Sequence, residues 1–229
     1  MPLQRTASAC ITLTLFVYVI LAGASYAQAA PRSSHKPAST GTHAYLLRGL
    51  LNVFSLGMDQ LRQKLEARGI QATVHSHMWW SQLADEAIQD YKAGRVRHIV
   101  IMGHSAGAIN AVDMANKIGS AGVPVSLVIT FDPAFRTTVE TTNVRHVINL
   151  YLPEGIGSKV YAVKGYRGVI ENVDLKESTH HMTLDKSAAV QDRAIGYVLR
   201  YAKGPSEPEA PKHAVARAKN GKNGAASRQ

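Results

Sequence analysis

Residues 96–118 read VRHIVIMGHSAGAINAVDMANKI, and this stretch decides the fold. Residues 96–102 are mostly β-branched and apolar, which is typical of a buried strand. Residues 106–118 carry small and apolar side chains, as a buried helix does. Between them lies the pentapeptide Gly103-His104-Ser105-Ala106-Gly107. A G-x-S-x-G pattern between a strand and a helix predicts a serine on a tight turn, with its hydroxyl exposed as a nucleophile.

The two glycines of this pentapeptide fit the same prediction. A Cβ atom at Gly103 or Gly107 would crowd the neighbouring strand or helix. The helix that follows would place its first amides and its positive dipole end near Ser105. The N–H group of Ala106 is therefore a candidate donor to an oxyanion. The alternative is an ordinary glycine-rich turn in which Ser105 only caps the helix.

Strand and helix patterns alternate through the rest of the central region. The expected strands are residues 44–47, 70–75, 123–131, 144–152 and 169–175, and the further expected helices are residues 58–68, 81–92 and 187–201. Alternation of this kind predicts a mostly parallel sheet with helices on both faces. The nearly continuous apolar strands agree with it, because both faces of such a sheet are buried. The predicted fold class is thus an α/β three-layer sandwich.

Two further segments carry a resemblance to a known family. The expected strand 123–131 runs into Asp132-Pro133-Ala134, and the last helix is preceded by His180-His181-Met182-Thr183-Leu184-Asp185. With the pentapeptide, these segments make residues 43–203 resemble the α/β-hydrolase superfamily, in particular its small lipase-like and thioesterase-like members. The resemblance implies a compact α/β-hydrolase fold. No cap domain is expected, because the longest candidate insertion, residues 133–143, is short.

The resemblance also implies roles for individual residues. Ser105 would be the nucleophile, Asp132 the acid and His181 the base, in the chain order Ser, Asp, His of this superfamily. His180 stays open as an alternative base, and Glu154 as an alternative acid. The second oxyanion donor would be the N–H group of Leu50. Lipases commonly have His-Gly just before this position, whereas this chain has Arg48-Gly49.

These roles lead to an expected activity and an alternative. The expected activity is hydrolysis of a carboxylic ester or thioester through an acyl-enzyme, with an acyl ester, a lipid or a polymer-bound ester as substrate. No cofactor is expected, and no metal either, because His75 and His77 lack an evident third ligand. The alternative is a non-catalytic binding protein of the cell envelope on the same fold, suggested by Arg48-Gly49 and by the open choice of acid.

The first 42 residues differ in composition from the central region. Residues 1–29 are predicted to be a signal peptide, with Arg5 before the uncharged stretch 11–22 and with Ala27-Gln28-Ala29 as a cleavage pattern. Residues 30–42, rich in Pro, Ser and Thr, are predicted to be a flexible linker. The expected location is secreted or periplasmic, and the alternative is an N-terminal membrane anchor. The single cysteine, Cys10, lies in the leader, so no disulfide is expected in the mature chain.

The net charge of +10 is spread over the whole chain. Residues 41–203 hold 18 Lys or Arg and 14 Asp or Glu, a net charge of only +4. Because no basic stripe with interleaved aromatic residues is present, nucleic acid is not an expected partner. Residues 204–229 have no periodic apolar face and are predicted to be a disordered basic tail, with weak contact to an envelope or membrane surface as a candidate role.

Overall fold

The computed structural model describes residues 41–50, 56–175 and 180–201, which all belong to one compact unit, His35–Gln229. The predicted signal peptide, most of the predicted linker and the predicted tail lie outside the described residues and stay predictions. None of the helices in the described ranges is long and apolar enough to cross a membrane.

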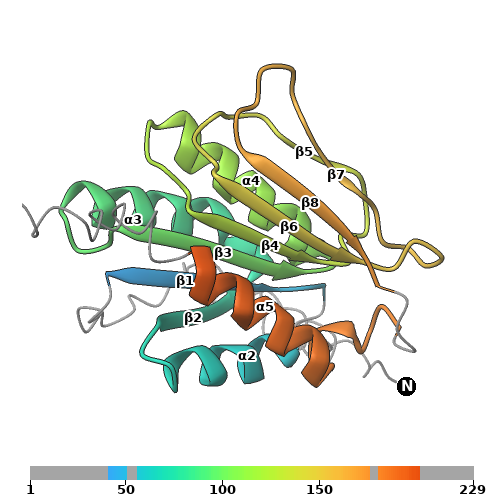
Figure 1. The fold of residues 1–229 in the computed structure, drawn as a ribbon. Coiled ribbons are helices and arrows are strands. Elements are labelled where there is room, and N and C mark those ends of the chain that lie inside the picture. Colours follow the sequence, from blue (N-terminus) through green and yellow to red (C-terminus); the bar gives the residue numbers. More distant parts are fainter. Residues whose placement is uncertain (1–40, 51–55, 176–179, 202–229) are drawn as a thin grey trace, which may run out of the picture. The chain divides into compact units, whose positions relative to one another are not determined.

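A six-stranded sheet forms the centre of the domain (Figure 1). Its strand order is β2-β1-β3-β4-β6-β8, and every neighbouring pair is parallel. The central strands are apolar along their whole length because helices cover both of their faces. The strands are β1 (Thr42–Arg48), β2 (Gln71–Ser76), β3 (His98–His104), β4 (Leu127–Phe131), β6 (His146–Tyr151) and β8 (Val169–Asp174).

Two helices lie on each face of this sheet (Figure 1). Helices α2 (Gly57–Glu66) and α5 (Ala188–Tyr201) pack on one face, and α3 (Trp80–Lys92) and α4 (Ala106–Ser120) on the other. Strand side chains alternate between the two resulting cores, so that Leu46 joins the first core while Tyr45 and Leu47 join the second. The predicted three-layer α/β fold is confirmed.

The connections contain elements that the sequence patterns did not predict. Strands β5 (Thr137–Val139) and β7 (Val160–Ala162) form a separate two-stranded parallel sheet. Two short 3₁₀ helices, η1 (His77–Trp79) and η2 (Leu184–Lys186), precede α3 and α5. Elements of three residues are too short to show a periodicity in the sequence. Strand β4 is also shorter than expected, because before Leu127 only Val125 forms a bridge, to Val144.

The parallel arrangement decides where a site can form. Parallel strands end at the same edge of the sheet, and ligands of open α/β sheets bind at that edge. Ser105 directly follows β3, and Asp132 directly follows β4. Leu50 and His181 come after β1 and β8 respectively. All four therefore lie beyond the carboxyl edge of the sheet.

Candidate active site

Ser105 occupies a strained turn between β3 and α4. Its φ angle of 58° and ψ angle of −119° lie outside the regions that side-chain-bearing residues normally adopt. The Ser105 N–H group donates to the carbonyl oxygen of Phe131 at 2.9 Å, which ties the turn to the end of β4. Strain of this kind persists only where the surrounding structure holds it. The turn presents the hydroxyl at the carboxyl edge of the sheet.

The glycines on either side of Ser105 are required by close backbone contacts. A Cβ atom on Gly103 would overlap the carbonyl group of Gly107. A Cβ atom on Gly107 would overlap the carbonyl oxygens of Leu47 and Arg48 at the end of β1. The start of α4 therefore lies directly against the end of β1, as the sequence pattern predicts for this turn.

His181 lies between the serine and an aspartate. Its Nε2 atom is 2.9 Å from Ser105 Oγ, and its Nδ1 atom is 2.7 Å from Asp132 Oδ2. Ser105 comes from the end of β3, Asp132 from the end of β4, and His181 from the turn before η2. The structure thus brings together, in one hydrogen-bonded chain, the three side chains that the resemblance assigns to catalysis. A serine, an imidazole and a carboxylate in this order can activate the hydroxyl for attack.

Asp132 is held in a single orientation by backbone contacts. The residue is fully buried and has a φ angle of 52°. Its Oδ1 atom accepts a hydrogen bond from the N–H group of Leu152 at 2.8 Å. A Cβ atom on Gly157 would overlap that same Oδ1 atom, so the loop after β6 closes over the carboxylate. Oδ2 is thereby left directed at His181.

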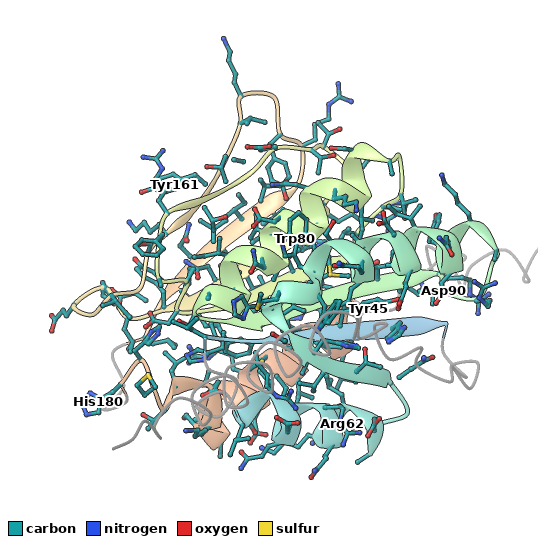
Figure 2. All side chains as sticks on the ribbon, turned by 180° about the vertical axis from the view of Figure 1, so that it is seen from behind. Tyr45, Arg62, Trp80, Asp90, Tyr161 and His180 are labelled. Atoms are coloured by element: carbon teal, nitrogen blue, oxygen red, sulfur yellow. The ribbon has the colours of Figure 1, made fainter. Side chains whose placement is uncertain are left out.

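The structure places the two alternative residues away from this chain of contacts. His180 is exposed, and Figure 2 shows it at the outside of the domain. Its backbone N–H group donates to Thr183 Oγ1 at 3.2 Å. Glu154 is exposed in the turn after β6. Within the described part of the chain, neither side chain makes a hydrogen bond to Ser105, His181 or Asp132.

The candidate oxyanion donors, the N–H groups of Ala106 and Leu50, directly follow Ser105 and come shortly after β1 respectively. Ala106 is the first residue of the 15-residue helix α4, where backbone N–H groups have no carbonyl partner within the helix. Leu50 lies in the turn after β1, whose last carbonyl groups contact Gly107. Leu50 is 64% exposed. Residues 51–55, which continue this loop, lie outside the described residues.

Arg48, the departure from the lipase pattern, braces the structure. Its Nε atom donates to Asp59 Oδ2 at 2.9 Å, and its Nη2 atom donates to Asp59 Oδ1. This bidentate ion pair links the end of β1 to the first turn of α2. Of the two roles that an arginine could take here, bracing the loop or meeting an acidic substrate group, the observed contact is the first.

His104 makes a contact that no sequence pattern predicts. The side chain is almost fully buried, and its Nε2 atom is 2.8 Å from the carbonyl oxygen of His181. Burial lowers the pKa of His104 to about 4, so the ring is neutral near pH 7. A neutral ring has one N–H group, and in this contact Nε2 must donate it to the carbonyl. His104, the second residue of the pentapeptide, thus holds the backbone that carries His181.

No group of three His, Cys, Asp or Glu side chains suited to a metal occurs among the described residues. His77 lies in η1, and the neighbouring Trp79 and Trp80 pack against the core between the sheet and helices α3 and α4.

In comparisons with known proteins, this chain is similar to solved structures but matches no curated protein sequence and no protein-family model. A hydrolase candidate of the alpha/beta superfamily from Xanthomonas campestris pv. campestris aligns at a TM-score of 0.42 and 14% identity, over 69% of this chain and 98% of that one. The NocB thioesterase domain from the nocardicin cluster aligns at a TM-score of 0.42 and 15% identity, over 70% and 94%. At these values the activities of the two proteins do not transfer to this chain, whose chemistry depends on its own residues.

Proposed function

We propose that this protein is a serine hydrolase that cleaves carboxylic ester or thioester bonds through an acyl-enzyme. The observation that carries the proposal is the hydrogen-bonded chain from Ser105 Oγ through His181 to Asp132, with distances of 2.9 and 2.7 Å. The positive φ angle of Ser105 and its place at the carboxyl edge of the sheet support it. A serine that merely caps a helix requires neither an imidazole partner nor a strained backbone.

In the proposed reaction, Ser105 Oγ attacks the carbonyl carbon of the substrate while His181 Nε2 accepts its proton. Asp132 fixes the ring so that Nδ1 carries its proton, and it stabilises the imidazolium that forms. The N–H groups of Ala106 and Leu50 would donate to the developing oxyanion. His181 then protonates the leaving alcohol or thiol, which departs and leaves an acyl group on Ser105. Water, activated by the same imidazole, releases the acid and restores the serine.

The substrate class follows from the side chains that surround this edge of the sheet. Six large apolar side chains that follow strand ends here are exposed by between 42% and 75%: Leu50, Leu56, Met78, Phe135, Ile156 and Met182. Leu50 and Leu56 follow β1, and the other four follow β2, β4, β6 and β8 respectively. Exposed apolar groups gathered on one side of a domain are typical of a binding surface. We therefore propose esters with an apolar acyl group, including lipids, as substrates.

A fluorophosphonate probe tests the proposal, because it phosphonylates an activated serine far faster than an ordinary one. We expect labelling of the wild-type protein and of His180→Asn, and none of Ser105→Ala. His181→Asn should label at least about 1,000-fold more slowly, since the base is lost while the adjacent histidine remains. Folded wild-type protein that does not react would overturn the enzyme proposal and favour a binding protein on this fold. Equal labelling of the two histidine variants would show that His181 is not the base.

A further inference from the structure

A second group of buried polar residues lies behind His181, where η2, α2 and α5 meet. Asp185, four residues after His181, is fully buried in η2. Gln191, in the first turn of α5, is 1% exposed. The proposed reaction uses neither residue. Burial of a polar side chain costs free energy unless its polar atoms are hydrogen-bonded, and the Gln191 side chain meets this condition.

The Gln191 side-chain amide connects the three elements. Its Nε2 atom donates to the Asp185 carbonyl oxygen at 2.7 Å and to the Gly57 carbonyl oxygen at 3.1 Å. Gln60 Oε1 lies 3.3 Å from the same nitrogen. One NH₂ group from α5 therefore serves backbone acceptors in η2 and at the start of α2. Its removal would leave two buried carbonyl groups without this donor.

Gly57 shows how closely η2 packs against the start of α2. A Cβ atom on Gly57 would overlap the carbonyl group of Asp185 and would also press on its side-chain carboxyl carbon. No side chain larger than hydrogen fits without moving the turn. The first residue of α2 thus sets the position of Asp185.

The position of Asp185 in turn affects His181 through a short stretch of hydrogen-bonded backbone. The N–H groups of Thr183 and Leu184 donate to the His180 carbonyl oxygen at 2.8 and 2.9 Å. This tight turn couples η2 rigidly to residues 180 and 181. His104 contacts the same stretch of backbone, at the His181 carbonyl oxygen.

We propose that Gln191 and Asp185 are positioning residues, which hold the turn carrying His181 at a hydrogen-bonding distance from Ser105 and Asp132. The proposal rests on the proposed function, because it assigns the two residues to the alignment of that base. Displacement of an aligned catalytic group by about 1 Å can cost about 100-fold in rate. Loss of the Gln191 hydrogen bonds should therefore lower kcat, whereas substrate binding at the exposed apolar side chains should change little.

The test compares Gln191→Leu with Ile99→Ala, a variant truncated in the core on the opposite face of the sheet. We expect Gln191→Leu to lower kcat at least about tenfold with KM changed by less than about twofold, the pattern of a misplaced catalytic group. Ile99→Ala, measured at a temperature where both variants are folded, should keep the wild-type kcat. Gly57→Ala should reproduce the kinetic effect of Gln191→Leu from the other side of the contact. If Gln191→Leu does not fold, Gln191→Met takes its place.

Proton NMR supplies a measurement that does not require turnover. The low-field resonance of the His181 Nδ1 proton, assigned by its loss in Asp132→Asn, should shift or broaden in Gln191→Leu and stay unchanged in Ile99→Ala. An unchanged resonance together with unchanged kcat in Gln191→Leu would overturn the proposal, as would equal effects in the two variants. A wild-type protein without hydrolase activity would contradict the proposed function alone, since the resonance still reports the position of the ring.

Discussion

At the scale of single residues, the candidate site depends on backbone positions that a Cβ atom would disrupt. Gly103, Gly107 and Gly157 each lie where an added methyl group would overlap a carbonyl group or a carboxylate. Ser105 and Asp132, in contrast, keep positive φ angles despite their side chains. Such strain is retained where the neighbouring structure determines the conformation, and this favours a role for both side chains.

Gly157 offers a direct test of the orientation of the acid. Its added Cβ atom would overlap Asp132 Oδ1, whereas a Cβ atom on Gly155 would make only ordinary contacts of 3.6 Å with Leu152. We expect Gly157→Ala to lower kcat by about 10- to 100-fold, because Asp132 must turn away from His181. Gly155→Ala should keep the wild-type rate within about twofold. Steady-state hydrolysis of a p-nitrophenyl ester measures both variants, and equal rates for the two would contradict the assignment of Asp132.

At the scale of elements, periodicity and apolar runs predicted six strands and four helices, because each is long enough to repeat its pattern. The nucleophile turn was predictable for a related reason, since both flanking elements adjoin the pentapeptide. The choice between His181 and His180 and between Asp132 and Glu154 came from a resemblance, because sequence patterns do not fix which loop side chains meet. Contacts of Gln191 with residues 57 and 60 join segments more than 130 positions apart. No local pattern marks such contacts, and β5 and β7 are too short to show one.

The buried carboxyl group of Asp185, where η2 meets α2, predicts that the free energy of unfolding depends on pH. Burial raises the pKa of Asp185 to about 6, although Lys186, His181 and the N–H groups of Gly57 and Asp185 act to lower it. Since the pKa is higher in the folded than in the unfolded protein, ionisation of Asp185 destabilises the fold as the pH rises from about 4 through 6. Asp185→Asn removes this penalty. The free energy of unfolding of Asp185→Asn minus that of wild type should therefore be about 2 to 3 kcal/mol larger at pH 7 than at pH 4.

Urea denaturation at the two pH values measures this difference. Asp192→Asn serves as the control, because Asp192 lies in the following helix, α5, with a side chain 65% exposed. It should leave the pH dependence of the free energy of unfolding at the wild-type value. Parallel stability curves for Asp185→Asn and wild type would show that the Asp185 carboxyl group is not buried in the folded protein as described.

At the scale of the whole domain, one edge of the sheet holds both the candidate catalytic groups and the exposed apolar side chains. A parallel sheet directs all its strand ends to that edge, so loops from β1, β2, β4, β6 and β8 reach it together. Other exposed apolar residues, such as Leu199 on α5, lie outside these loops. The exposed side chains of these loops form the proposed substrate surface, whereas single exposed apolar side chains such as Leu199 are normal on proteins.

Side chains in these loops and Leu199 on α5 should therefore differ in their effect on turnover. Phe135 is 72% exposed after β4 and Ile156 is 56% exposed after β6, and each would be covered by an acyl chain bound beside Ser105. An apolar contact worth about 1.4 kcal/mol changes kcat/KM about tenfold, and one buried methylene contributes about 0.8 kcal/mol. We therefore expect Phe135→Ser and Ile156→Ser each to lower kcat/KM for p-nitrophenyl octanoate about 3- to 30-fold, and to change that for the acetate ester less than about twofold. Leu199→Ser, at 40% exposure, should change neither. Equal losses on both esters would show that these side chains support the site without binding the acyl chain, and a loss in Leu199→Ser would place that chain elsewhere.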